Sequence, residues 1–132
     1  MKIYIIKTTF DNIKDANKLQ SILLDRRLVS CVQLSQIKSA YIWNDKICNE
    51  DEIQLSIKTN KKNAKRVESI ILDMHPYEIP QILILKSKAS KSYLKWHKKE
   101  LKANKILFHY KDYPLAQGGT QHLLSVKSTH LC

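Results

Sequence analysis

The sequence predicts an α+β fold in which the order strand, helix, strand occurs twice. Two stretches alternate apolar and polar residues as half-buried strands do, and each is followed by apolar residues at helical spacing. The tripeptide Ile-Lys-Thr recurs where strand meets helix, at residues 6–8 and 57–59. At 132 residues, 43% of them hydrophobic and 27% charged, the chain has the length and composition of one globular domain.

The first unit begins with KIYIIKTT at residues 2–9, which is rich in β-branched and aromatic residues and predicts a strand. Asp11 is expected to cap the helix that follows, because a carboxylate can accept a hydrogen bond from an N-terminal backbone amide. The helix is expected to run to about Arg27. Its apolar residues recur at helical spacing and predict a buried stripe made of Ile13, Ala16, Leu19 or Gln20, and Leu23.

The second strand is predicted over residues 28–43, and its apolar alternation changes phase. Val32 and Leu34 share one face, whereas the later apolar positions have the opposite parity: Ile37, Tyr41 and Trp43. A β-bulge near residues 35 and 36 would explain this change. The residues Asn-Asp-Lys at 44–46 then predict a hairpin turn.

The second unit repeats the pattern. Residues 52–60 alternate cleanly and predict a strand whose apolar face is Ile53, Leu55 and Ile57. A helix is predicted from Lys61 to Met74, with a buried stripe of Ala64, Val67, Ile70 or Ile71, and Met74. His75 should end this helix, because a residue before proline is disfavoured in the helical conformation. IPQILILK at 79–86 predicts the last strand.

Two strand–helix–strand units joined by a hairpin predict the ferredoxin-like arrangement, an antiparallel sheet with two helices on one face. The other face then needs a cover, because the segment Gln-Ile-Leu-Ile-Leu is apolar on both sides. A partner subunit is the economical cover. We therefore expect a homo-oligomer.

Four segments together resemble the CutA divalent-cation-tolerance proteins: LVSCVQL, SAYIWNDKICNEDEIQLSIKT, HPYEIPQI and SYLKW. The resemblance covers about residues 1–100, so we expect a CutA-like domain over 1–103 and a C-terminal extension over 104–132. It implies a ferredoxin-like fold with a further C-terminal helix, a homotrimer, a cytoplasmic location, and a link to copper and other divalent metals. The biochemical activity of that family is poorly defined.

Charge and cysteine content limit the function classes. The net charge of +11 is almost all lysine and is spread along the sequence, which favours a solvated surface over a nucleic-acid patch. Three scattered cysteines do not predict a disulfide framework. The sequence shows neither a signal-peptide core nor the roughly 20 apolar residues of a membrane span. We expect a reduced cytoplasmic protein without a nucleic-acid or membrane partner.

The segment HPYE at residues 75–78 allows two interpretations. The first is a rigid helix-to-strand turn, in which Tyr77 packs and Glu78 is solvated. The second is a metal site, because His75 and Glu78 offer a nitrogen and an oxygen ligand three residues apart. The resemblance places this segment near the subunit interfaces, so both interpretations can hold.

Cys31 is the other candidate metal ligand. If Val32 and Leu34 face the helices, Cys31 lies on the opposite face with Gln33, where a partner subunit would lie. A thiolate suits copper(I) well, and the resemblance implies that the matching cysteine is the one linked to metal. The alternative is that Cys31 is a small buried hydrophobe.

Five further residues are predicted to line a cleft or an interface: Tyr41, Trp43, Lys58, Tyr77 and Trp96. The aromatic residues are expected to be packing anchors, and Lys58 is expected to be solvated or to face an anion. In the extension, ILFHY at 106–110 predicts an edge strand, and His122, His130 and Cys132 match no standard metal site.

No catalytic motif occurs, so we expect no enzyme. The leading hypothesis is a trimeric cytoplasmic protein of divalent-cation tolerance that binds copper or another divalent metal ion through Cys31, His75 and Glu78. The alternative is a trimeric regulatory module that binds a small anionic ligand in clefts between subunits, lined by Lys58 and the HPYE segment.

Overall fold

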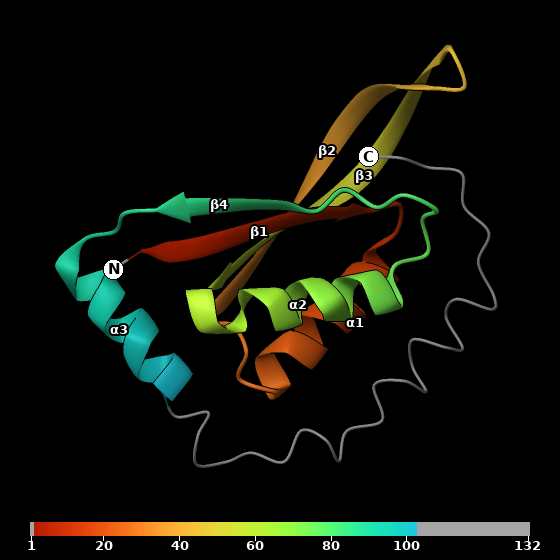
Figure 1. Ribbon diagram of the computed structural model, residues 1–132. Coiled ribbons are helices and arrows are strands. Elements are labelled where there is room, and N and C mark those ends of the chain that lie inside the picture. Colours follow the sequence, from red (N-terminus) through yellow and green to blue (C-terminus); the bar gives the residue numbers. More distant parts are fainter. Residues whose placement is uncertain (1, 103–132) are drawn as a thin grey trace.

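The computed structural model describes residues 2–102 and shows one α+β unit (Figure 1). Its elements are β1 (Ile3–Phe10), α1 (Ile13–Asp25), β2 (Cys31–Trp43), β3 (Lys46–Thr59), α2 (Lys61–Met74), β4 (Leu83–Ser87) and α3 (Lys91–Lys102). The four strands form one sheet of order β2-β3-β1-β4 in which every pair is antiparallel. The predicted ferredoxin-like fold and its extra C-terminal helix are confirmed. The strand predicted at 106–110 lies outside the described residues.

Helices α1 and α2 pack on the same face of the sheet and form the core with it (Figure 1). Every residue of the stripe predicted for α2 is buried. In α1 the prediction is correct for Ala16, Leu19 and Leu23 but wrong for Ile13, whose side chain is 51% exposed. Ile13 is the first residue of the helix and lines an open cleft beside residues 36–38 and 51–53, so its side chain stays partly in contact with solvent.

Asn12, and not Asp11, caps helix α1. The Asn12 side-chain oxygen accepts a hydrogen bond of 2.8 Å from the backbone N–H of Asp15, and its amide donates to the carboxylates of Asp11 and Asp15 at 2.7 and 2.8 Å. The prediction that Asp11 caps the helix is therefore wrong by one residue, since Asp11 lies one position before the extended residue from which the helix starts.

Asn12→Ala should lower the free energy of unfolding by about 1 kcal/mol, because it removes the acceptor for a backbone amide at the helix start. Asp11→Ala, the matched control, should lower the free energy of unfolding by a few tenths of that value at most. Its carboxylate accepts a hydrogen bond from the Asn12 side-chain amide and none from the helix backbone. Urea titration of both variants measures the difference. Equal losses in the two variants would contradict the assignment of the cap.

Strands β2 and β3 form a long hairpin that extends beyond the helices (Figure 1). The pairing is unbroken from Cys31 with Lys58 to Trp43 with Lys46, so the predicted bulge near residues 35 and 36 is wrong. The phase change has another cause. The first half of the hairpin lies over α1 and α2 and turns its apolar residues toward them, whereas the outer half, which we call the arm (residues 37–52), has no helix beneath it. Its aromatic side chains occupy the other face, whereas Ile42 and Ile47 remain on the first face and are 69% and 76% exposed.

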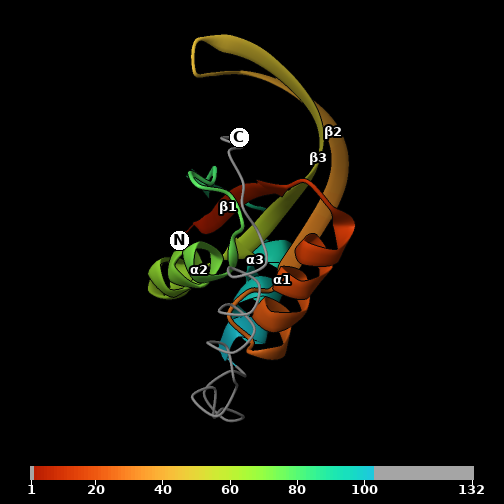
Figure 2. The same cartoon turned by 90° about the vertical axis from the view of Figure 1, so that its right-hand side faces the viewer.

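The arm curves toward the open side of the sheet, the side without α1 and α2 (Figure 2). Side chains alternate between the two faces and the register is continuous, so the concave face of the arm is the face on which Cys31 lies. It carries Tyr41, Trp43, Cys48 and Glu50. The predicted turn is a two-residue loop in which Asn44 and Asp45 have φ values of 51° and 63°. Positive φ at both positions is the type I′ geometry that matches the twist of a hairpin.

The last strand is shorter than predicted and leaves apolar side chains exposed. It begins at Leu83 and not at residue 79, because Pro80 lacks the N–H that a ladder needs. Leu83 and Leu85 share the open face with Ile5 and are 48% and 46% exposed. This side of the sheet is thus apolar along β4 without a cover from the described chain.

Helix α3 is held at the end of the hairpin opposite to the arm. His97 is 1% exposed, and its Nε2 donates to the Thr59 carbonyl oxygen at 3.1 Å while its Nδ1 accepts from the Ser30 hydroxyl at 2.6 Å. Arg27 pairs with Glu100 at 3.4 Å on the same side.

Across residues 2–102, no helix is long and apolar enough to span a membrane.

Candidate functional site

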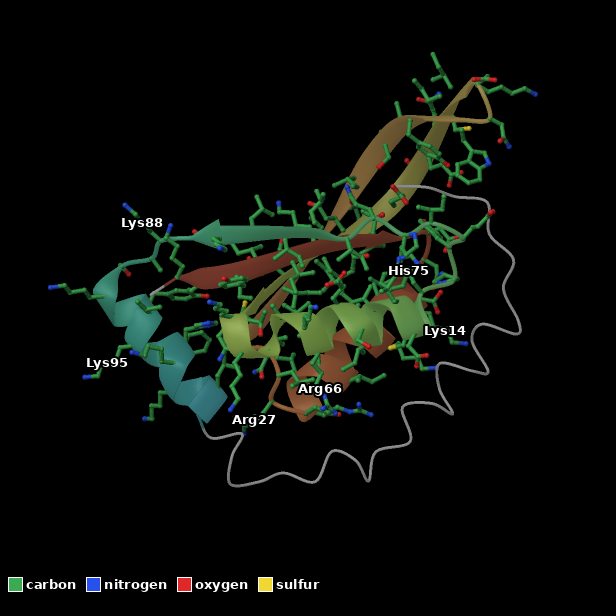
Figure 3. The ribbon with its side chains drawn as sticks, in the orientation of Figure 1. Lys14, Arg27, Arg66, His75, Lys88 and Lys95 are labelled. Atoms are coloured by element: carbon green, nitrogen blue, oxygen red, sulfur yellow. The ribbon has the colours of Figure 1, made fainter. Side chains whose placement is uncertain are left out.

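His75 lies at the end of β1, under the segment that leads from α2 to β4 (Figure 3). The residue ends α2 as predicted, with φ −74° and ψ 132°. Its ring is 2% exposed and stacks on the ring of Phe10 at a centroid distance of 4.3 Å. Nε2 donates to the Thr9 carbonyl oxygen at 2.7 Å, and Nδ1 accepts from the backbone N–H of Tyr77 at 3.2 Å. Both ring nitrogens therefore have partners within the chain, which fixes a neutral ring that holds the turn.

Tyr77 fills the space beyond His75 and carries a buried hydrogen bond that the sequence did not predict. The phenol is on a residue only 4% exposed and donates to Glu52 Oε2 at 2.7 Å. Burial, followed by the hydrogen bond to Glu52, raises the pKa of Tyr77 far above its ordinary value, so the phenol stays protonated as the donor. Glu78 is exposed. The burial of Tyr77 and the exposure of Glu78 agree with the first interpretation of this segment, a rigid turn.

Glu52 is the residue that sequence reasoning missed. It is 3% exposed, and its second oxygen, Oε1, has no hydrogen-bond partner within residues 2–102. In the sequence it looks like one of three successive acidic residues at 50–52, a pattern typical of a solvated stretch. The signal that could have found it is the alternation along the strand. Glu52 pairs with Ile37 and its side chain lies on the same face of the sheet as that of Cys31.

Cys31 begins β2, is partly exposed and forms no disulfide. It pairs with Lys58 and lies on the open face with Gln33, as predicted. The Lys58 side chain is not fully solvated, since Nζ donates to the Tyr93 hydroxyl at 3.3 Å and lies 5.2 Å from the centre of that ring. The Cys31 side chain thus lies beside that of Lys58 on the open side of the sheet.

Within one chain, the predicted ligands do not meet. Cys31 lies in the row of Lys58 and Ile5, whereas His75 contacts Thr9. Four residues along β1 correspond to roughly 13 Å. No group of three or more His, Cys, Asp or Glu residues in the described part of the chain could hold a metal ion. A site that used both residues would need more than one subunit.

The other predicted interface residues are dispersed. Tyr41 and Trp43 lie on the concave face of the arm, where the Tyr41 hydroxyl donates to Glu50 at 3.1 Å. Trp96 lies on α3, 41% exposed, with its ring 5.4 Å from that of Tyr93. An open cleft of about 530 Å³ lies at the base of the arm, lined by residues 11–13, 36–38 and 51–53. Lys38 and Asp51, paired at 2.9 Å, belong to its wall.

A four-stranded antiparallel sheet of this order, with two helices on one face, defines a ferredoxin-like α+β protein. Residues 4–100 match the family of the CutA1 divalent ion tolerance proteins, so the chain belongs to that family.

Individual members of the family show the same likeness. The probable divalent-cation tolerance protein cutA homolog of Encephalitozoon cuniculi is 32% identical over 94 residues, which are 70% of this chain and 82% of that protein. The divalent-cation tolerance protein CutA of Pyrococcus horikoshii is 31% identical over 99 residues, 74% of this chain and 97% of that one. The periplasmic divalent cation tolerance protein CutA of Archaeoglobus fulgidus has a solved structure with a TM-score of 0.71, 26% identity, and coverage of 75% of this chain and 98% of that chain.

Proposed function

We propose that this protein serves divalent-cation tolerance as a homotrimer that binds copper or another divalent metal ion and catalyses no reaction of its own. The observation that carries the proposal is the family match, which spans nearly the whole described chain. The proposal includes the cytoplasmic location expected from three scattered cysteines, although the similar Archaeoglobus protein is described as periplasmic.

The proposed trimer is supported by what the single chain leaves uncovered. Leu83 and Leu85 expose nearly half of their surface on the open face, and β4 is an edge strand with no neighbouring strand on its outer side among residues 2–102. Tyr41 and Trp43 add aromatic surface on the concave face of the arm. Apolar and aromatic surface of this kind is typical of a subunit contact. Light scattering should give a mass near three times the 15.4 kDa of one chain.

Cys31 is the residue best suited to be the primary ligand. The residue is partly exposed, and its sulfur as a thiolate is a soft donor of the kind that copper(I) prefers. His75 is a less suitable partner, because coordination would require it to give up one of two hydrogen bonds in a buried ring. Glu78 is exposed and can rotate toward a ligand on another subunit. The proposed site is therefore centred on Cys31 and completed across a subunit contact.

Cys31→Ala should weaken copper(I) binding at least about tenfold, or about 1.4 kcal/mol, in an oxygen-free competition titration against a chromogenic chelator. The matched control is Cys48→Ala, which removes a partly exposed thiol from the arm and should bind as the wild type does. Glu78→Gln should weaken binding by a smaller factor. Equal affinity of the Cys31→Ala variant and the wild type would refute a site centred on Cys31.

The alternative of an anion site shared by Lys58 and the HPYE segment gains no support within the chain. Lys58 lies in the row of Cys31 and is engaged with Tyr93, whereas residues 75–78 lie near the far end of β1. The match to a family of divalent ion tolerance proteins favours metal binding over an anion site, so we propose metal binding alone.

A further inference from the structure

The outward face of α3 and the turn before it form a cluster of lysines that the proposed metal function does not use. Residues 88–100 contain five lysines and one glutamate, a balance of +4 out of the chain's +11. The five are all exposed, and we call them the lysine stripe: Lys88, Lys91, Lys95, Lys98 and Lys99. Figure 3 shows Lys88 and Lys95 projecting away from the molecule, whereas Lys14 and Arg66 lie on other elements.

Helical geometry gathers these lysines although the sequence spreads them out. Lys91, Lys95 and Lys98 are separated by four and three residues, which places them on one side of a helix over roughly 10 Å. The single acidic residue, Glu100, turns toward Arg27 and does not neutralise them. No ion pair involves the stripe within the described residues. Like charges at this spacing destabilise a helix, and no ion pair among residues 2–102 offsets that cost.

The opposite side of α3 is occupied, which fixes how the stripe is presented. His97 is bound to Thr59 and Ser30, and Leu101 is 6% exposed. The helix has therefore used most of its apolar side against the protein, and the single exposed ring of Trp96 does not make the continuous apolar face with which an interfacial membrane helix inserts into lipid. The stripe is a rigid cationic surface that suits a polyanion lying on top of it.

We propose that the lysine stripe binds the phosphate backbone of single-stranded nucleic acid. Lysines at helical spacing offer successive point charges to successive phosphates, as in channels that follow a strand without sequence preference. Trp96 lies at the border of the stripe with 41% of its side chain exposed, so an unpaired base can stack on its ring. This aromatic neighbour favours a single strand over a duplex, whose bases are already stacked.

The experiment is fluorescence anisotropy of a labelled oligouridine with the full-length protein at low salt. The triple variant Lys91→Gln, Lys95→Gln, Lys98→Gln should bind at least about tenfold more weakly than the wild type. A plot of log affinity against log salt concentration should become shallower. Each phosphate contact contributes roughly 0.7 to the magnitude of its slope, so the loss of three contacts should reduce that magnitude by about 2. The matched control loses the same charge elsewhere, through Lys14→Gln, Lys46→Gln and Lys65→Gln on α1, the arm and α2, and should keep its affinity within about twofold.

A second variant tests the stacking. Trp96→Leu should weaken oligouridine binding at least about fivefold and leave heparin binding unchanged, because heparin has charge but no bases. Light scattering verifies that each variant keeps the wild-type mass. The proposal is overturned if the wild type does not bind oligouridine, or if the control triple loses as much affinity as the stripe triple. It is also overturned if anionic vesicles, and not oligouridine, bind through the stripe.

Discussion

Tyr77→Phe should lower the free energy of unfolding by about 2–3 kcal/mol at neutral pH, a large effect for the loss of one oxygen atom. The phenol donates at 2.7 Å to a carboxylate that is 3% exposed. The other oxygen of this carboxylate already lacks a partner within residues 2–102. The substitution would leave Glu52 buried without this donor, and an unsatisfied buried charge costs more than the hydrogen bond itself contributes.

A double-mutant cycle separates this effect from simple loss of packing. In the background Glu52→Gln, where the charge is gone, Tyr77→Phe should cost about 1 kcal/mol less than in the wild type. Tyr4→Phe is the matched control, because Tyr4 is a partly buried tyrosine whose ring centre lies 5.7 Å from Lys86 Nζ. Urea titrations at one fixed protein concentration give all the values. If Tyr77→Phe lowers the free energy of unfolding no more than Tyr4→Phe does, the hydrogen bond between Tyr77 and Glu52 does not stabilise the fold as expected.

The same phenol should make the protein sensitive to alkaline conditions. Burial, followed by the Glu52 hydrogen bond, raises the pKa of Tyr77, so the folded chain keeps a proton that the unfolded chain releases near pH 10. The unfolded state then binds fewer protons, and the free energy of unfolding falls as the pH rises above about 10. The slope reaches about 1.4 kcal/mol per pH unit for one such group. Tyr77→Phe should lack this contribution to the slope.

The parts of the fold that the sequence predicted well are those in which local signals agree. Helix α2 has an asparagine cap at Asn60, an uninterrupted apolar stripe, and a stop at His75 before Pro76, and its observed bounds agree with the prediction of a helix from about Lys61 to Met74. The end of β2 offered no such agreement. Its alternation changes phase because the environment changes where the helices end, and a sequence pattern alone cannot distinguish that from a bulge.

The candidate site was predictable in its members but not in its geometry. The face of Cys31 followed from simple alternation, and the structure agrees. The separation of Cys31 from His75 depends on how far apart two rows of the sheet lie, which needs the register. Glu52 was missed because its burial comes from Tyr77, 25 residues away in sequence. A carboxylate is ordinarily solvated, and only a tertiary contact can overturn that expectation.

His97→Leu should lower the free energy of unfolding by about 2–3 kcal/mol, because it removes the two buried hydrogen bonds that His97 makes between α3 and the rest of the molecule. Those bonds reach Thr59 on β3 and Ser30 just before β2, and the ring is 1% exposed. Lys95→Leu, an exposed site on the same helix, is the control and should change stability by no more than about 0.5 kcal/mol.

The attachment through His97 should also weaken in acid. Burial, as the largest cause, lowers the pKa of His97, and the nearby Lys58 acts in the same direction while the hydrogen bond to Thr59 opposes it. Below about pH 6.5 the unfolded chain therefore binds a proton that the folded chain refuses. The free energy of unfolding then decreases as the pH is lowered, by up to about 1.4 kcal/mol per pH unit, until the folded ring also takes up the proton. Urea titrations at a series of pH values should show this slope in the wild type and a shallower one in His97→Gln, which keeps a polar side chain but cannot titrate. Identical slopes in both proteins would mean that His97 is not the group whose protonation releases α3.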